Sequence, residues 1–225
     1  MQKRVLKFRL ALHQNQNTMK ETIRQVIEHE AQAIRNIPVS DGMIDAIELI
    51  HKQVHVKKGK LVTSGMGKAG QIALNMATTF SSTGTPAVFL HPSESQHGDL
   101  GVLQENDVLL VISNSGKTRE IIELIDLAEN LYPGIPLIVI SSNSEGSLAK
   151  SADAFIYTGN PKEVCPLGLS PTTSTTVMTV IGDALVVSLM NKIGFTNEDY
   201  AKRHHGGYLG DKSRLQACSE KDTKK

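Results

Sequence analysis

Short segments that are apolar at every position constrain the fold of this sequence most. The clearest are "VLLVIS" at 108–113 and "LIVIS" at 137–141, which lack the alternation of apolar and polar residues found in strands with one face in water. Strands of this kind are covered on both faces, as in a parallel sheet with crossover helices on either side. The sequence therefore predicts an α/β fold.

Strand-like and helix-like segments alternate along most of the chain. Apolar residues at helical spacing predict helices over 68–82, 117–131, 145–151 and 173–193. The segments between them predict strands over 60–64, 87–90, 107–113, 136–142 and 154–159. Because strands joined by helical crossovers run parallel, we expect a three-layer αβα sandwich with a five-stranded parallel sheet, of the flavodoxin-like type.

The region before the first strand carries a helical pattern of its own, over 17–54. Pro38 divides this pattern into two helices, and Ser40 or Asp41 is the expected N-cap of the second. We expect both N-terminal helices to pack on the sheet.

The whole pattern predicts a single domain over 17–210, with an N-terminal extension over 1–16 and a polar C-terminal tail over 211–225 that we expect to fray. A length of 225 residues leaves room for a full core. The most apolar stretch, 175–190, contains Asp183 and falls short of a membrane span, so it predicts a buried helix.

Composition narrows the class of protein. Basic and acidic residues nearly balance, 24 against 23, whereas a nucleic-acid surface usually shows a basic excess. The two cysteines, Cys165 and Cys218, are too few for a disulfide framework and suit a reducing cytoplasm. Charged residues interrupt the N-terminal segment, so it does not form the apolar region of a secretion signal. We expect a cytoplasmic protein without a membrane or nucleic-acid partner.

The glycines of "GMGKAG" (65–70) spell G-x-G-x-x-G directly after a predicted strand. A dinucleotide site with this fingerprint needs an acidic residue about 20 positions further on, to bind the ribose hydroxyls. Leu90 and His91 occupy that register, and Lys68 stands inside the loop. The sequence therefore argues against NAD binding.

The segment "SNSGKTRE" (113–120) is a stronger signal. It offers the hydroxyls of Ser113, Ser115 and Thr118, with Asn114 among them, at the junction of a buried strand and a helix. Backbone N–H groups and the positive end of a helix dipole favour a phosphate at such a junction. Serine and threonine are also common helix caps, but three hydroxyls and a glycine exceed what capping needs. The segment indicates an anion-binding nest for one phosphate.

Three further segments carry unusual polar residues. Each of them alone is compatible with a structural role, because isolated histidines and helix-start hydroxyls are common. They are "HPSESQHGDLG" (91–101), "KEVCPLGLSPTTSTT" (162–176) and "RHHGGYLG" (203–210).

Taken together, these segments resemble the sugar isomerase (SIS) domain, and specifically the arabinose 5-phosphate isomerases. Five motifs of that family occur in order, within about 45–210. They are "GMGKAG" (65–70), "STGTPAVFLHPSESQHGDLG" (82–101), "SNSG" (113–116), "KEVCPLGLSPTTSTT" (162–176) and "HHGGYLG" (204–210). The resemblance implies that the glycine turn is a close-packed junction that presents Lys68.

The resemblance also implies an activity: interconversion of D-arabinose 5-phosphate and D-ribulose 5-phosphate without a metal or organic cofactor. Such an enzyme supplies the eight-carbon sugar acid Kdo for lipopolysaccharide or capsule. The family's functional lysine falls on Lys68, its paired glutamates fall on Glu120 and Glu163, and its histidines fall on His97 and His204. His204 is expected to reach a neighbouring subunit's site, which implies a homotetramer.

Substrate contacts of the family carry over to Gly84, Thr85 and His91, and His91 matches a histidine at which zinc can bind and inhibit. The remaining candidate substrate-binding residues carry hydroxyl or amide groups near the expected strand ends. They are Ser64, Ser113, Asn114, Ser115, Thr118, Thr172 and Ser174.

Aldose–ketose isomerisation sets its own requirements, because a proton moves between adjacent carbons through an enediol. The reaction needs a base, proton transfer to oxygen and stabilisation of negative charge. A carboxylate whose pKa is raised by partial burial suits the first task, and histidine suits the second. We hypothesise that Glu163 or Glu120 is the base, His204 the proton shuttle and Lys68 the electrostatic stabiliser.

Some features depart from the family pattern. Many relatives continue into a pair of regulatory CBS modules, whereas this sequence ends at Lys225, so we expect a form without them and without regulation by adenine nucleotides. A downstream product, CMP-Kdo, is a candidate regulatory ligand. Lys117 and His205 stand where relatives usually have other residues. Two alternatives stay open: a non-catalytic regulator that binds a phosphosugar, and an isomerase of another sugar phosphate.

Overall fold

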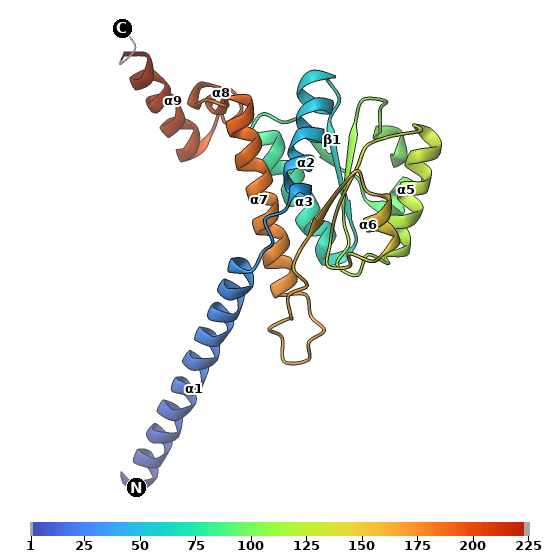
Figure 1. Cartoon of the computed structure of the whole chain (residues 1–225). Coiled ribbons are helices and arrows are strands. Elements are labelled where there is room, and N and C mark those ends of the chain that lie inside the picture. Colours follow the sequence, from blue (N-terminus) through green and yellow to red (C-terminus); the bar gives the residue numbers. More distant parts are fainter. Residues whose placement is uncertain (1, 223–225) are drawn as a thin grey trace.

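The computed structural model describes residues 2–222 and contains a five-stranded sheet (Figure 1). All neighbouring strands are parallel, and their order is β2-β1-β3-β4-β5. The predicted fold class and all five predicted strands are confirmed. The strands are β1 (Leu61–Gly65), β2 (Ala87–Phe89), β3 (Val108–Ile112), β4 (Leu137–Ser141) and β5 (Ala154–Tyr157).

Helices cover both faces of this sheet, which explains why β1, β3 and β4 are buried at every residue. Successive side chains of a strand point to opposite faces. Thus Leu110 packs with α2 (Asp41–Ile50), α3 (Gly67–Ser82) and α7 (Thr173–Ile193), whereas its neighbour Leu109 packs with α5 (Arg119–Leu131) and α6 (Ser147–Ser151). The result is the expected three-layer sandwich.

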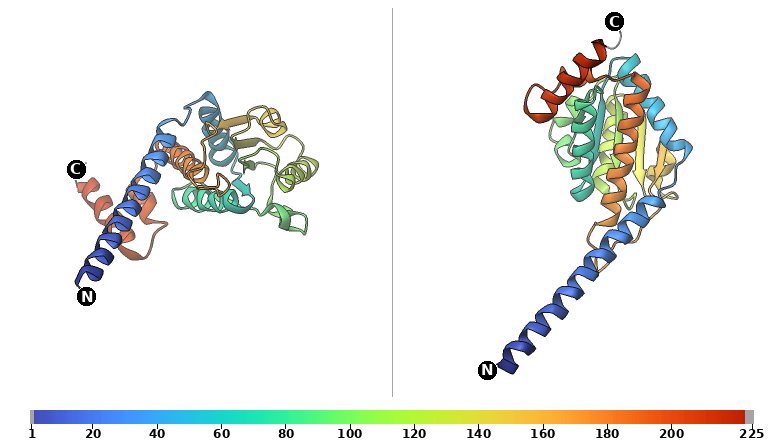
Figure 2. Two further views of the ribbon diagram at one scale, coloured as in Figure 1. Left: turned by 90° about the horizontal axis from the view of Figure 1, so that it is seen from below. Right: turned by 90° about the vertical axis from the view of Figure 1, so that its left-hand side faces the viewer.

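The two N-terminal helices behave differently from each other. α2 packs on β5 as expected and continues into a π-helical turn, His51–Val56. Ser40 is its N-cap residue, but the Ser40 side chain makes no capping hydrogen bond. α1 (Gln2–Arg35) is one continuous helix. The C-terminal end of α1 packs against α7, and the rest of α1 extends away from the body (Figures 1 and 2). α1 therefore packs against the body only at its C-terminal end, where Ala33 contacts the core.

α7 is the one helix in the described part of the chain that is long and apolar enough to cross a membrane. It is instead a core helix, as predicted, and contributes Val177, Ile181 and Leu185 to the core. Gly182 lets it approach α3, since a Cβ at this position would lie 2.8 Å from Met76 Cγ.

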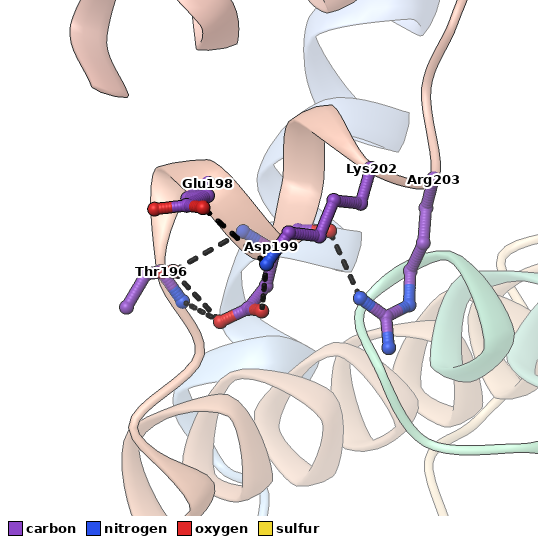
Figure 3. A network of polar contacts seen from close by, with 5 residues as sticks. All are labelled: Thr196, Glu198, Asp199, Lys202 and Arg203. Carbon is purple, nitrogen blue, oxygen red and sulfur yellow. Dashed lines mark hydrogen bonds and ion pairs between the residues drawn. The ribbon is translucent and has the colours of Figure 1, made fainter. Parts of the chain in front are cut away.

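The C-terminal part of the chain is more ordered than predicted. α8 (Asn197–Ala201) begins with a capping box, in which the Thr196 hydroxyl accepts a 3.1 Å hydrogen bond from the Asp199 backbone N–H and the Asp199 carboxylate accepts from the Thr196 N–H (Figure 3). α9 (Gly207–Asp222) follows and packs against α8. The expected fraying of the tail is therefore wrong up to Asp222; residues 223–225 lie outside the described residues.

Candidate active site

The glycine turn after β1 brings two backbone segments into direct contact. A Cβ on Gly70 would lie 2.5 Å from the Gly65 carbonyl oxygen, and a Cβ on Gly65 would lie 2.9 Å from the Ala69 carbonyl group. Both positions therefore require glycine. The close-packed junction predicted from the sequence is confirmed, and it places Lys68 on the exposed first turn of α3.

The nest between β3 and α5 is held by hydroxyl and amide contacts. Ser113 Oγ and Thr118 Oγ1 lie 2.8 Å apart, and the Asn143 amide donates a 2.9 Å hydrogen bond to the Ser115 carbonyl oxygen. Thr118 is the N-cap residue of α5, yet its side chain makes no capping hydrogen bond. Because the hydroxyl turns toward Ser113 instead, simple capping does not account for it. Gly116 has a φ of +63°, which completes the turn.

A cavity of about 250 Å³ joins the glycine turn, the nest and the start of α7 at the carboxyl edge of the sheet. Parallel α/β sheets bind their ligands at this edge. Of the predicted site residues, the cavity brings together Lys68, Ser113, Asn114, Ser115, Thr118 and Ser174. Its other lining residues are Met66, Ala69, Ile112, Pro171, Thr175 and Met178.

Glu163 lies beside this cavity and caps the N-terminus of α7. Its Oε2 accepts hydrogen bonds from Thr172 N (2.7 Å), Thr172 Oγ1 (3.0 Å) and Ser174 N (3.3 Å), and its Oε1 accepts a short one from Ser174 Oγ. The predicted substrate-binding residues Thr172 and Ser174 therefore both hold Glu163. A carboxylate at a helix N-terminus also has a favourable interaction with the helix dipole.

The electrostatics of Glu163 differ from the expectation of a raised pKa. Partial burial alone would raise it, but the hydrogen bonds from Ser174 and Thr172 together outweigh burial and lower the pKa of Glu163. The carboxylate is therefore held in its ionised form. The sequence did not indicate this, because the four donors become neighbours of Glu163 only when the loop folds onto α7.

Glu120 has a simpler setting. It is half-buried in the first turn of α5, two residues after Thr118, and its side chain makes no hydrogen bond or ion pair with another described residue. Thr118 lines the cavity, whereas Glu120 does not. The structure places this glutamate near the nest with its carboxylate oxygens available.

Three predicted substrate contacts lie away from the cavity. Ser64 is fully buried in β1, and its hydroxyl donates a 2.6 Å hydrogen bond to the Leu90 carbonyl oxygen. Gly84 and Thr85 precede β2, at the amino edge of the parallel sheet, and the Thr85 hydroxyl lies 3.1 Å from His55 Nε2. Within one chain these two residues cannot contribute to the cavity at the opposite edge.

His91 and His97 lie in the segment after β2, on the carboxyl side. The ring of His91 packs edge-on against Phe89, and its Nδ1 is buried without a hydrogen-bond partner in the described part of the chain. His97 is exposed in the turn after the short helix α4 (Pro92–Ser95). No cluster of three or more His, Cys, Asp or Glu among the described residues is placed to hold a metal, so a single chain does not fit the zinc site implied at His91.

His204 follows α8, which lies at the far end of α7 from the cavity (Figure 1). α7 begins at the cavity and has 21 residues, which at 1.5 Å per residue separates its ends by about 30 Å. His204 stacks on Tyr200 with ring centroids 3.7 Å apart, and its Nδ1 lies 3.0 Å from the Tyr200 carbonyl oxygen. The structure therefore does not bring His204 to the cavity of its own chain.

Some lining residues were missed from the sequence. Thr175 belongs to the hydroxyl run "TTSTT" and could have been selected with Ser174, whereas Met66 and Met178 carry no chemical signal. Ser142 was also missed, although its hydroxyl donates a 2.5 Å hydrogen bond to the Asn114 carbonyl oxygen and supports the nest. The hydroxyl-rich end of β4 was the available signal.

The fold and the cavity define a class: an α/β domain with a compact, hydroxyl-lined site at the carboxyl edge of its parallel sheet. The family model of the SIS domain matches residues 55–188, which are more than half of the chain. The protein therefore belongs to the SIS domain family, as its five motifs predicted.

Curated relatives are similar in sequence. Arabinose 5-phosphate isomerase KdsD of Shigella flexneri is 52% identical over 159 residues, which are 71% of this chain and 48% of the relative. The protein of the same name from Yersinia pestis is 45% identical over 195 residues, which are 86% of this chain and 58% of the relative. The chain thus spans about half the length of the curated relatives it matches.

Solved structures match over nearly their whole length. A Bacteroides fragilis protein assigned as a phosphosugar isomerase involved in capsule formation has a TM-score of 0.83 and 66% identity, covering 84% of this chain and 99% of that one. The c3406 protein of E. coli CFT073, in complex with arabinose 5-phosphate, has a TM-score of 0.77 and 34% identity, covering 84% and 98%.

Proposed function

We propose that this protein is an isomerase that interconverts D-arabinose 5-phosphate and D-ribulose 5-phosphate through an enediol. The observation that carries the proposal is the cavity, which joins Lys68 and the hydroxyl nest to Ser174, a hydrogen-bond partner of Glu163. Binding a phosphosugar requires the nest alone, whereas proton transfer also requires a base and a cation. The arabinose 5-phosphate complex of a structural relative supports the choice of substrate.

The reaction is balanced within the substrate. A base removes the proton from C2 of the aldose, the electron pair forms the enediolate, and the proton returns at C1 while a proton moves between the two oxygens. The nest binds the phosphate, and Lys68 stabilises the negative charge that develops. The step requires no oxidant, reductant or metal.

Glu120 and Glu163 are both candidates for the base. The Oε2 atom of Glu163 already accepts three hydrogen bonds, so Oε1 is the atom that remains for a substrate proton. Glu120 has both oxygens available. Glu163→Gln and Glu120→Gln measured side by side identify the base, which is the residue whose amide variant loses kcat.

His204 is the proposed proton shuttle, supplied by a neighbouring subunit of a homotetramer. The distance of about 30 Å along α7 supports this arrangement, because it removes His204 from the site of its own chain. Exposed apolar side chains on both projecting helices are also typical of surfaces that pair with another chain. They are Met19, Ile23 and Ile27 on α1 and Tyr208, Leu209 and Leu215 on α9.

The proposed setting is the cytoplasm, where the product feeds Kdo synthesis for lipopolysaccharide or capsule. The structural relative assigned to capsule formation and the two free cysteines support this setting. CMP-Kdo is the proposed feedback ligand, bound at the open edge of the sheet. Unchanged isomerase activity at saturating CMP-Kdo would contradict that part of the proposal.

The test is a coupled assay on purified protein with arabinose 5-phosphate, ribose 5-phosphate, glucose 6-phosphate and fructose 6-phosphate. We expect turnover of arabinose 5-phosphate only, and a loss of about 100-fold or more in Lys68→Ala. Lys150→Ala, which removes an exposed lysine on α6 outside the cavity, is the matched control.

The other outcomes select the alternatives. Turnover of a different sugar phosphate assigns the chain to another isomerase reaction. Thermal stabilisation by a phosphosugar without any turnover assigns it to the phosphosugar-binding regulators; the use of Glu163 as a helix cap is the observation that favours this candidate.

A further inference from the structure

Two consecutive residues of α1 contact the two ends of the segment that holds Glu163. His29 Nε2 forms a 2.9 Å hydrogen bond with the carbonyl oxygen of Lys162, the residue before Glu163. The Thr176 hydroxyl donates a 2.9 Å hydrogen bond to Glu30 Oε2. Thr176 lies in the first turn of α7, two residues after Ser174.

Packing alone does not hold this part of α1 against the loop. A cavity of about 290 Å³ lies between them, lined by His29, Gln32 and Ala33 on α1, by Asn36 just after it and by residues 158–162 of the loop. The loop beyond Glu163 is open to solvent, with Leu167 and Leu169 77% and 79% exposed. The hydrogen bonds from α1 are therefore specific contacts that add to those between Glu163 and the start of α7.

We propose that His29 and Glu30 form a clamp that positions the Glu163 carboxylate for the reaction. Both are positioning residues, because neither lines the active-site cavity. The inference rests on the proposed function, in which Glu163 belongs to the acid–base set. The clamp comes from outside residues 55–188, the part of the chain that the family model matches.

The clamp acts through the four hydrogen bonds that Glu163 accepts. Thr172 and Ser174, at the start of α7, hold the carboxylate by hydrogen bonds. The hydrogen bond between His29 and the Lys162 carbonyl holds the backbone just before Glu163. Releasing either end lets the carboxylate move relative to the substrate while the phosphate nest stays intact. A small displacement of a reacting group costs turnover more than binding, so loss of the clamp should lower kcat and leave KM nearly unchanged.

The experiment uses paired variants of the full-length chain. His29→Ala and Glu30→Ala remove the two contacts, whereas His29→Gln keeps a donor and Glu30→Gln keeps an acceptor. Glu28→Ala is the control, because Glu28 lies on the same turn and, among the described residues, its side chain pairs only with the exposed Arg35. We expect each alanine variant to lower kcat about tenfold with KM within twofold, and each glutamine variant to restore most of the loss.

A second readout does not depend on activity. Hydrogen exchange of the backbone amides of Val164, Thr172 and Ser174 should accelerate in His29→Ala and Glu30→Ala but not in Glu28→Ala. Wild-type kcat in both alanine variants, glutamine variants as impaired as the alanine ones, or unchanged exchange at these amides would overturn the clamp. A wild-type protein that does not isomerise arabinose 5-phosphate refutes the proposed function, and the exchange experiment still decides whether the clamp exists.

Discussion

The two ends of α7 carry different parts of the proposed catalytic set, and they are built differently. At the N-terminal end, Glu163 accepts four hydrogen bonds, and α1 contacts the segment on both sides. At the C-terminal end, His204 contacts Tyr200 and the Arg214 side chain within its own segment, and the apolar residues of α9 beside it are exposed. The segment of Glu163 is thus held by contacts within the chain, whereas apolar side chains near His204 are exposed.

The capping box shows that the far end is nonetheless a defined structure. Thr196 and Asp199 hold each other at the start of α8, and Arg203 donates a 2.9 Å hydrogen bond to the Asp199 carbonyl oxygen (Figure 3). The hydrogen bonds from Thr196 lower the pKa of Asp199, so the Asp199 carboxylate is held in its ionised form. His204 follows three residues after α8 and is held against it, because its ring stacks on Tyr200 and its Nδ1 lies 3.0 Å from the Tyr200 carbonyl oxygen.

The largest effect is expected from His204→Ala. Loss of a general acid–base group typically lowers turnover by 10²–10⁴-fold, so we expect kcat to fall by about 100-fold or more. His205→Ala removes the neighbouring exposed imidazole and is the control. Wild-type kcat in His204→Ala would show that the segment after α7 takes no part in catalysis.

An intermediate effect is expected from Gly116→Ala, which alters the nest. The added Cβ would lie 3.1 Å from Ser141 Oγ and 3.2 Å from Asn143 Cβ, at a φ of +63°. We expect KM for arabinose 5-phosphate to rise about tenfold, because the phosphate site is distorted. Gly134→Ala is the matched control: its φ is +79° and its Cβ would meet nothing within 4 Å, so it carries backbone strain without touching the nest. An equal rise of KM in both variants would contradict the assignment.

A smaller effect, on stability, is expected from Glu163→Ala. Loss of a helix cap costs about 1–2 kcal/mol, and the size of this loss depends on pH. Because the pKa of Glu163 is lowered from 4.5 in the folded protein, its contribution is fully present above pH 4.5 and disappears as pH falls through the folded pKa. Thermal unfolding should show a gap between wild type and variant at pH 7 that closes on acidification. A gap that widens at low pH would show that the carboxylate is not stabilised in its ionised form.

The smallest effect is expected from Cys165→Ser. Cys165 does not line the cavity, so kcat should change by less than about twofold. Hydrogen bonds from the backbone N–H groups of Ser170 and Leu169 lower the pKa of the Cys165 thiol to about 7. Alkylation by iodoacetamide, with the variant as blank, should therefore rise to half its maximal rate near pH 7. A midpoint near pH 9 would show that the loop does not hold these donors against the sulfur.

The sequence predicted the features that depend on residues adjacent in the sequence. Unbroken apolar runs identified the strands, and the glycines of "GMGKAG" identified the close-packed turn. Helical periodicity predicts a helix but not what the helix packs against, so it could not show that most of α1 extends away from the body. The polar tail looked frayed, because the contact of α9 with α8 is not visible in local composition.

The positions of the site residues were harder to predict where one motif spans a strand, because its two ends then lie at opposite edges of the sheet. "STGTPAVFLHPSESQHGDLG" spans β2, so Gly84 and Thr85 lie at the amino edge of the sheet while His91 and His97 lie at the carboxyl edge. The family resemblance assigned substrate contacts to Gly84, Thr85 and His91 without showing that they lie at two separate edges of the sheet. If Gly84 and Thr85 share a substrate with Lys68, which lies at the opposite edge, they do so across a subunit boundary.

The most direct test of an active site shared between two chains is subunit complementation between Lys68→Ala and His204→Ala. Each variant alone should be inactive toward arabinose 5-phosphate. After the two are mixed, unfolded and refolded together, sites that combine an intact Lys68 from one chain with an intact His204 from another should restore a substantial fraction of wild-type activity. A mixture that assembles like the wild type and stays inactive would contradict a site divided between two copies of the chain.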